Sequence, residues 1–364
     1  MRSLGELFAA VPDPRAGNAR HDLSELLFIA FAAVLCGAQN CEEMADFGLE
    51  KAGLLQQVLR LPHGVPSHDT FSRVFRLLDP LAFEAAFRRF METFAARLGG
   101  QVGTAGQVVA IDGKSLAGAF EVGAQATPLH LVTAWAVDQR LVLAQRTAAH
   151  RNEAAAAREV IGLLDLQATT VTGDALHANR QMAAAICQQG GDYVLALKPN
   201  QGPLYRATVA VLDHQPVAAA SRETAHGRTE ARYAAIATVD PDWARRFGFK
   251  HLAAVARIDA SRKPGEPCSS RYFVLSRPLS AQAVLDVARR HWSIENQQHW
   301  ILDVAFNEDA ARARKDHAAE NIALLRRLAL NVLRGDVLKA SIRRKIKRAG
   351  WSDTYLLNLL AQMR

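Results

Sequence analysis

Two aspartates each follow a run of residues that is typical of a β-strand. Asp112 follows "VVAI" and Asp174 follows "TTVT". In open α/β sheets the reacting groups gather just beyond the carboxyl ends of the strands, so we expect the two carboxylates to lie in one site. A single aspartate there is more often a turn residue or a helix cap, and Asp112 before Gly113 also fits that interpretation. Two aspartates in equivalent positions favour a shared function.

A third carboxylate, Glu295, lies in the stretch "HWSIENQQHW". The flanking sequence predicts a helix, on which residues three, four and seven positions apart share a face. That face contains Trp292, His299 and Leu302 and is largely apolar. An isolated charge there is costly, so Glu295 should be hydrogen-bonded to His291 or His299, protonated or metal-bound. A zinc site with the two histidines is disfavoured, because the HExxH order is missing.

Two aspartates and a glutamate form a hard, all-oxygen ligand set that suits Mg²⁺ or Mn²⁺. Two such ions about 3.5–4 Å apart activate an attacking water or 3′-hydroxyl and stabilise the leaving oxygen of a phosphodiester. Basic residues near the acids agree with an anionic substrate. They are Lys114, Arg180, Lys198, Arg312 and Arg314. We expect Arg312 and Arg314 on the same helix as Glu295.

The first hundred residues are typical of amphipathic helices. The stretch "PSHDTFSRVFRLLDP" and the residues after it predict a helix, a tight turn and a second helix, which would present Arg73 to a DNA groove. An ordinary helical hairpin fits the same pattern. Residues 1–100 are therefore interpreted as an all-α, DNA-binding domain, and the glycine-rich stretch at 99–106 as its boundary.

Beyond this boundary the pattern predicts an α/β domain with a mixed sheet and flanking helices. Residues 104–201 would form its first part, and residues 281–335 would complete it with the helix that carries Glu295. Between them, residues 202–280 contain strand-like runs separated by turns. We interpret them as a β-rich insertion.

The chain is basic, with a net charge of +8 and an isoelectric point near 9.6, which favours a polyanionic partner without requiring one. Residues 336–364 contain the run "LKASIRRKIKRAG", which has six basic residues and no acid. This run is either a solvated face or a helical tail that contacts phosphates. The contacts would come from Arg343, Arg344 and Lys345.

The composition is that of an ordinary protein of two or three domains, since 364 residues with 49% hydrophobic content can bury a sizeable core. No signal peptide is recognisable at the N-terminus. The run "LLFIAFAAVLC" is shorter than the roughly 18 residues of a membrane-spanning helix, and it predicts a buried helix instead. The four cysteines lack CxxC spacing. Together these features predict a cytoplasmic protein.

Several motifs occur in a specific order along the chain. They are "AIDGKSL", "VTGDALHANRQ", "GGDYVLALKPNQ", "HGRTEAR" and "HWSIENQQHWILDVAFNEDAARARKDHAAENIALLRRLALNVL". Together with the N-terminal "VPDPRAGNARHDLSELLFIAFAAVLCGAQNCEEMADFG", they resemble the H-repeat-associated branch of bacterial insertion-sequence transposases of the DDE type, over nearly the whole chain. His226 in "HGRTEAR" is a candidate contact with transposon-end DNA.

The resemblance implies an RNase H-like catalytic core with Asp112, Asp174 and Glu295 as its metal-binding triad. It also implies a β-rich insertion between the second aspartate and the glutamate. Such an enzyme would use Mg²⁺ or Mn²⁺ to cut double-stranded DNA at its terminal inverted repeats and join the freed 3′ ends to target DNA. It would do so as a homodimer at the bacterial nucleoid, without a covalent protein–DNA intermediate.

Three positions depart from the pattern of these transposases. The catalytic glutamate usually follows an arginine by four positions and precedes a lysine by seven, where this chain has His291 and Leu302. The branch commonly has Lys-Ser-Leu-Arg-Gly after the first aspartate, and here Ala117 replaces the arginine. Two other functions therefore stay open: an inactive or domesticated DNA-binding relative, and a metal-dependent nuclease that does not transfer strands.

Overall fold

The structure is a computed structural model and describes residues 2–15, 17, 19–97, 106–121, 124–225, 228–261 and 269–362. Most of the expected boundary at 99–106, and His226, lie outside these residues.

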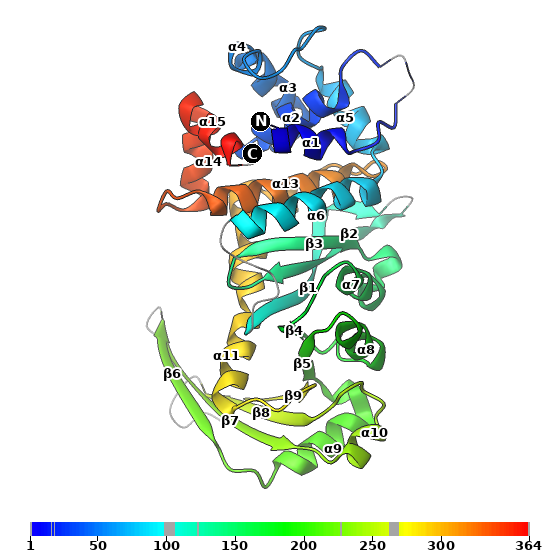
Figure 1. Cartoon of the computed structure of the whole chain (residues 1–364), viewed down its shortest axis with the longest axis vertical. Helices are drawn as coiled ribbons and strands as arrows, with labels where there is room; N and C mark the ends of the chain where they lie inside the picture. The colour runs from blue at the N-terminus through cyan, green and yellow to red at the C-terminus, as the bar shows by residue number, and fades with distance from the viewer. Residues whose placement is uncertain are drawn as a thin grey trace.

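The molecule is elongated, with helices at one end and strands in the middle and at the other end (Figure 1). The helical end comprises α1 (Arg2–Ala9), α2 (Leu23–Leu35), α3 (Cys41–Glu50), α4 (Ala52–Leu55), α5 (His68–Leu77), α6 (Pro80–Arg97), α13 (Ala318–Gly335), α14 (Ile342–Trp351) and α15 (Asp353–Ala361).

Helix α2 is the buried centre of the helical end. Asp22 caps its start, since the carboxylate accepts a hydrogen bond from the Glu25 backbone N–H at 3.1 Å. The helix ends at Leu35, and Gly37 follows with a φ of +106°, which glycine adopts without steric cost. The residues of α2 from Leu26 onward are at most 5% exposed, so the prediction of a buried helix is confirmed. Within the described residues, no helix combines the length and apolar character needed to cross a membrane.

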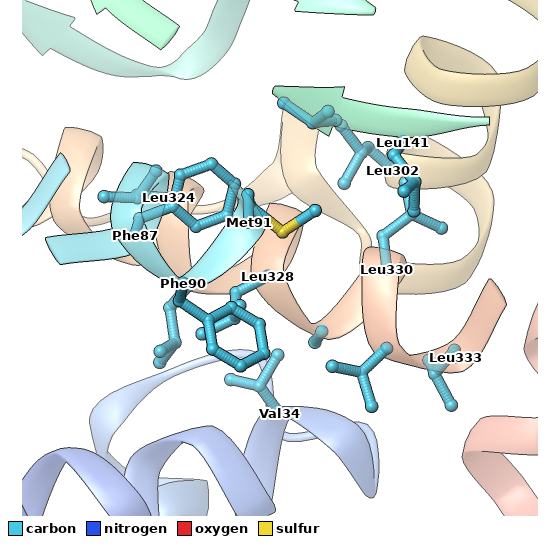
Figure 2. Close-up of a cluster of buried hydrophobic side chains, with 14 of the residues drawn as sticks. Val34, Phe87, Phe90, Met91, Leu141, Leu302, Leu324, Leu328, Leu330 and Leu333 are labelled. Atoms are coloured by element: carbon cyan, nitrogen blue, oxygen red, sulfur yellow. The ribbon is translucent and has the colours of Figure 1, made fainter. Parts of the chain in front are cut away.

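Helix α13 joins the two ends of the chain in one hydrophobic core. It packs against α2, α5 and α6, and also against strand β3 (Leu141–Thr147). Figure 2 shows Leu324 and Leu328 of α13 close to Phe87 and Phe90 of α6, above Val34 of α2. Helices α14 and α15 pack on α2 as well. The N-terminal helices thus share their core with the C-terminal residues.

In the part of the chain that the structure describes, nine strands form one sheet. They are β1 (Gln107–Glu121), β2 (Ala124–Ala136), β3, β4 (Thr169–Gly173), β5 (Asp192–Leu197), β6 (Ala219–Ala225), β7 (Arg228–Thr238), β8 (Ala254–Ser261) and β9 (Ser269–Leu275). Their order is β3-β2-β1-β4-β5-β9-β8-β7-β6, and β4 is parallel to both β1 and β5 while the other pairs are antiparallel. The predicted mixed α/β fold is confirmed.

Residues 202–280 contain strands β6 to β9 but also two helices. Helix α9 (Gly202–Leu212) opens the region, and the short α10 (Pro241–Arg245) lies between β7 and β8. The expectation that only turns separate these strands is therefore wrong. Helix α10 forms locally because the Asp240 carboxylate accepts a hydrogen bond from the Asp242 backbone N–H at 2.7 Å. The strands extend the main sheet, since β9 pairs with β5 and covers an edge that would otherwise be open.

The remaining helices flank the sheet. They are α7 (Glu153–Gly162), α8 (Arg180–Gln188), α11 (Ala281–His291) and α12 (Trp300–Phe306), with a π-helical turn at Glu295–His299 and 3₁₀ turns at Ala149–Arg151, Pro199–Gln201 and Glu308–Ala310. Helices α7 and α8 lie on one face and α11 crosses the other (Figure 1). Val109 and Ile111 of β1 belong to the apolar cluster under α7 and α8, whereas Val108 and Ala110 belong to the cluster on the α11 side. Because strand residues alternate, Asp112 points to the α11 side.

Candidate active site

Asp112 and Asp174 come together at the point where strands β1 and β4 cease to pair. The last pair in the parallel register is Ile111 with Gly173, so each aspartate is the next residue along the chain after this pair. Strand β1 itself continues to Glu121, because it stays paired with β2. The expectation that Asp112 ends its strand is therefore wrong, but the end of β4 produces the same juxtaposition.

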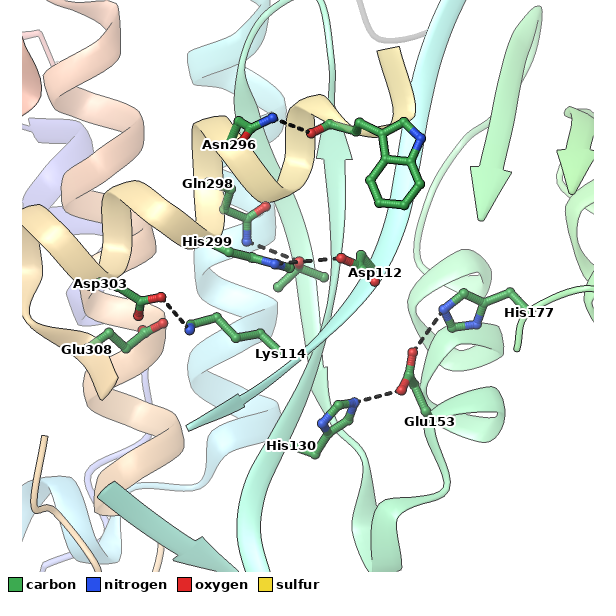
Figure 3. A network of polar contacts seen from close by, with 12 residues as sticks. Asp112, Lys114, His130, Glu153, His177, Asn296, Gln298, His299, Asp303 and Glu308 are labelled. Atoms are coloured by element: carbon green, nitrogen blue, oxygen red, sulfur yellow. Dashed lines mark hydrogen bonds and ion pairs between the residues drawn. The ribbon is translucent and has the colours of Figure 1, made fainter. Parts of the chain in front are cut away.

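The Asp112 carboxyl has histidines near it but no lysine or arginine partner among the described residues. Burial raises the pKa of Asp112 to about 7; the Gly113 backbone N–H and the charge of His177 lower it, and the charge of Asp174 raises it further. His299 Nδ1 lies 3.6 Å from Asp112 Oδ2 (Figure 3), but burial lowers the pKa of His299 to about 3, so its ring is neutral at neutral pH. Among the described residues, no lysine or arginine pairs with Asp112. Lys198 Nζ lies 3.8 Å from Asp174 Oδ2 at the solvent side.

Glu295 starts the π-helical turn between α11 and α12, and its side chain is exposed. It lines a pocket of about 340 Å³ over strands β7 to β9, together with Arg271 and Trp292. Within the described residues, no three His, Cys, Asp or Glu side chains are arranged to hold a metal ion. The structure therefore brings two of the three predicted carboxylates together and leaves Glu295 apart from them.

The π-helical turn explains why helical spacing misplaced Glu295. A regular α-helix would put Glu295 and Leu302 on one face, whereas a π turn hydrogen-bonds five residues apart and rotates the residues on either side of it, so that Leu302 is buried and Glu295 is exposed. Both histidines face the aspartates. His291 is buried, which lowers its pKa to about 4 although the charge of Asp174 acts to raise it, and His299 faces Asp112.

A second polar group lies behind Asp112, on the α7 and α8 side of the sheet (Figure 3). His130 Nε2 lies 2.8 Å from Glu153 Oε2, and His177 Nε2 lies 3.1 Å from Glu153 Oε1. Burial alone would raise the pKa of Glu153, but the two histidines outweigh it and lower this pKa to about 2. The group packs directly against Gly113, where an added Cβ would lie 2.4 Å from His130 Nε2 and 2.6 Å from Glu153 Cδ. Only glycine fits next to Asp112 in this arrangement.

The His130–Glu153–His177 group was not predicted from the sequence. The available signal was His130, which lies inside the apolar run "LHLVTAW" of β2. A histidine that is buried in such a strand needs a polar partner, because an unpaired polar group is costly to bury. The partner, Glu153, follows a helix cap, since the Asn152 side chain accepts a hydrogen bond from the Ala155 backbone N–H at 3.1 Å. A glutamate in a first helical turn is common, so that signal was weak.

Lys114 ties strand β1 to the segment after α11. Its Nζ donates hydrogen bonds to Asp303 Oδ2 at 2.8 Å and to Asp309 Oδ1 at 2.9 Å (Figure 3). Burial lowers the pKa of Lys114, but the two carboxylates raise it above its ordinary value. The side chain is only 8% exposed, and its charge is already compensated. The prediction that Lys114 contacts DNA is therefore corrected, because its ammonium is used inside the protein.

Arg312 and Arg314 are exposed, but they do not lie on the helix after Glu295. Helix α12 ends at Phe306, because Asn307 adopts a left-handed conformation with a φ of 52°. The Arg314 guanidinium lies 4.7 Å from the centre of the Phe120 ring, and its Nε donates to a backbone carbonyl of β1 at 2.9 Å. Both arginines therefore lie on an extended segment beside β1.

The other predicted DNA contacts are placed as follows. Arg180 is exposed at the start of α8, Arg73 on α5, and Arg343 and Arg344 on α14. Lys345 is buried, and its Nζ donates to the backbone carbonyls of Leu333 at 2.8 Å and of Asp336 at 2.9 Å. The prediction for Lys345 is therefore corrected, because this lysine closes the C-terminal end of α13.

The departures from the transposase pattern also have structural positions. His291 is neutral at neutral pH and buried, so it does not supply the positive charge of an arginine. Leu302 is fully buried in the core. Ala117 is exposed on β1.

Comparisons with known proteins cover nearly the whole chain. Residues 6–91 match a family described as DDE_Tnp_1-associated, and residues 103–332 match the transposase DDE domain. The chain is 34% identical to "Putative transposase YncI" of Escherichia coli O157:H7, over 99% of this chain and 95% of that protein. It is 32% identical to "H repeat-associated putative transposase YhhI" of Escherichia coli (strain K12), over 99% of this chain and 98% of that protein. A structure of piggyBac transposase in a synaptic complex with hairpin DNA aligns with 99% of this chain and 78% of that one, at a TM-score of 0.43 and 12% identity, too weak a likeness to support an argument.

Proposed function

The chain belongs to the transposase DDE domain family, in the branch of the H-repeat-associated proteins, and from this premise we propose that it cuts and transfers DNA strands. It cuts at the terminal inverted repeats of its own insertion sequence and joins the freed 3′ ends to target DNA. The observation that carries the proposal is that Asp112 and Asp174 each follow directly on the last parallel pair of β1 with β4. Two carboxylates in this position are suited to phosphodiester chemistry assisted by a cation.

The residues at this position fit Mg²⁺ or Mn²⁺. The donors are carboxylate oxygens, and Asp112 is partly buried without a lysine or arginine partner among the described residues. Asp112 and Asp174 would hold the ion. We propose Glu295 as the third ligand, as the family resemblance implies, once its segment has moved from the position over β7 to β9 that it has in this structure. When bound, the ion would lower the pKa of the attacking hydroxyl and stabilise charge on the phosphate.

The protein's own residues fix the position of the two aspartates. The His130–Glu153–His177 group packs against Gly113 and holds β1 from the α7 side. Lys114 holds β1 to Asp303 of α12, and thereby to the segment that carries Glu295. Both contacts limit the movement of Asp112. Strand transfer requires such fixed positions, because small displacements of a reacting group slow the reaction.

We propose that strands β3-β2-β1-β4-β5 form an RNase H-like core and that β6 to β9 are its insertion between Asp174 and Glu295. The strand order and the parallel pairs on both sides of β4 support this assignment. The N-terminal helices and α14 would bind double-stranded DNA, in a homodimer in the bacterial cytoplasm. The exposed residues that would contact phosphates are Arg73, Arg180, Lys198, Arg312, Arg314, Arg343 and Arg344.

The test uses the inverted repeats that flank the gene, labelled at one 3′ end and incubated with the purified protein in Mg²⁺ or in EDTA. Asp112→Asn, Asp174→Asn and Glu295→Gln should each abolish cutting and leave binding of the repeat roughly unchanged. Asp46→Asn is the matched control, because Asp46 is exposed on α3, far from the site in sequence and fold. Cutting that persists in one of the three variants would remove that residue from the triad.

A second function, DNA binding without cutting, is favoured by one observation. Glu295 lines the pocket over β7 to β9 and does not reach the aspartates, and the charged neighbours usual in the family are replaced by His291 and Leu302. A retained gel shift with no metal-dependent cutting would establish this function. Cut ends that are never joined to new DNA would instead identify a nuclease.

A further inference from the structure

A pocket of about 810 Å³ opens beside the loop that follows Asp174. Three arginines line it from three separate elements: Arg158 from α7, Arg180 from α8 and Arg246 from the end of α10. No aspartate or glutamate is among its lining residues. The pocket therefore concentrates positive charge next to the loop that follows Asp174.

None of these arginines is neutralised within the part of the chain that the structure describes. Their neighbours behave differently, since Arg245 forms an ion pair with Asp242 and Arg146 forms one with Glu84. Like charges that converge without an anion repel one another, and an anion that enters gains from all of them. Guanidinium groups also bind phosphate oxygens through two parallel hydrogen bonds.

The backbone around the pocket adds to this preference. Asn152 and Asn179, which cap the starts of α7 and α8, both line the pocket together with residues of the first helical turns. Helix N-termini carry partial positive charge and favour anions. Phe247 and Phe249 supply an apolar wall on the opposite element, against which a sugar or base could pack.

The pocket lies next to the segment that follows Asp174. Asn179 lies on the short segment that connects Asp174 to α8. Gln201, which also lines the pocket, donates a hydrogen bond from its Nε2 to the Ala175 carbonyl at 2.5 Å, directly after Asp174. A strand whose phosphate lies at Asp174 would therefore have the pocket within reach of its neighbouring phosphates.

We propose that this pocket binds the phosphodiester backbone of the DNA strand adjacent to the phosphate that reacts at Asp112 and Asp174. This inference rests on the proposed function. Three arginines on separate elements span more space than a single free phosphate would fill, which favours a chain of phosphates over one anion. The pocket would thus set which phosphate of the strand reaches the aspartates.

The test compares two double variants with the same change in charge. Arg158→Gln with Arg246→Gln removes two pocket arginines, and Arg180 is kept because its stem packs beside Gly248. Arg206→Gln with Arg245→Gln is the control, since both arginines are exposed nearby but do not line the pocket. The full chain is titrated with a fluorescent duplex of the terminal repeat, in EDTA, at several salt concentrations.

Each phosphate contact contributes about 0.9 to the slope of log affinity against log salt, so the pocket variant should lose about 1.8 of that slope. Its affinity should fall about tenfold for each arginine removed. The control variant should keep the slope of the unmodified protein. Equal slopes for the two double variants would overturn the inference and leave the proposed function standing. If the unmodified chain itself fails to bind the duplex, the proposed function fails first.

A second arm distinguishes DNA from a free anion. Inorganic phosphate and a mononucleotide are titrated calorimetrically into the unmodified chain and into the pocket variant. Weak or no binding of both, together with the loss of DNA affinity, supports the proposal. Tight binding of either small anion that the pocket variant loses, with DNA affinity unchanged, would make the pocket a site for a free phosphate compound and overturn the proposal.

Discussion

Replacement of Gly113 by alanine tests how the strand of Asp112 is held. In the structure an added Cβ would lie 2.4 Å from His130 Nε2 and 2.6 Å from Glu153 Cδ, where ordinary contacts begin at 3.4 Å. Neither neighbour moves freely, because His130 also lies 2.8 Å from Ser115 Oγ and Glu153 is held between two histidines. Either the His130–Glu153 pair opens or β1 shifts by about 1 Å.

The size of the effect follows from these two alternatives. Overpacking of a well-packed site costs about 1–3 kcal/mol of the free energy of unfolding. A displacement of about 1 Å at a reacting group lowers the rate about 100-fold even where the fold survives. Gly113→Ala should therefore reduce the cutting rate far more than a loss of about 1–3 kcal/mol in stability would by itself, because the folded fraction stays near one.

The measurement is urea unfolding and single-turnover cutting of the repeat duplex, for Gly113→Ala and for Gly162→Ala. Gly162 is the matched control, because it ends α7 and an added Cβ there would meet nothing within 4 Å. Its replacement should leave the cutting rate unchanged and raise stability by about 0.5–1 kcal/mol. If Gly113→Ala matches Gly162→Ala in both stability and rate, the argument that the His130–Glu153 pair positions Asp112 is refuted.

Three further predictions concern buried charges. Lys114→Met should lower the free energy of unfolding by about 2–4 kcal/mol, because it leaves two carboxylates without their cation; urea unfolding against the exposed control Lys339→Met checks it. Arg327→Met should lower the free energy of unfolding by about 3–5 kcal/mol in the same assay, because it leaves the fully buried Glu308 without its cationic partner. Adding Glu308→Gln should restore part of the loss, and an unchanged urea midpoint in the single variant would contradict this prediction. The pKa of Glu153 in the fold, about 2, lies below its ordinary 4.5, so its charge stabilises the fold above pH 4.5 and that contribution is lost as the pH falls toward 2. Glu153→Gln should remove this pH dependence of stability. If the stability of this variant still falls as steeply between pH 4.5 and 2 as that of the unmodified protein, the prediction is wrong.

Features set by local sequence could be predicted, and features set by distant contacts could not. The capped and apolar run of α2 and the strand runs before Asp112 and Asp174 depend on neighbouring residues, and the structure has them where they were expected. The burial of Lys114 depends on acids roughly 190 positions away, and that of Lys345 on the end of α13. No local pattern distinguishes such lysines from solvated ones.

The predicted orientation of the Glu295 side chain is wrong for a different reason. Helical spacing assumes 3.6 residues per turn, and one π-helical turn is enough to separate side chains that a regular helix would align. The turn starts at Glu295 itself, so the side chain of this residue is the one that helical spacing misplaces. Such turns leave no clear signal in composition, and π-helical turns are frequently found at functional sites.

The core shared by α2, α6 and α13 has a consequence for the chain as it leaves the ribosome. Roughly 220 residues separate the end of α6 from the start of α13, and at roughly 5–20 residues per second they take roughly 10–45 s to synthesise. During this interval the apolar faces of the first helices have no cover from α13, and a chain that stops before Ala318 never acquires it. Nascent and truncated chains should therefore depend on chaperones or be degraded, so that only completed chains accumulate.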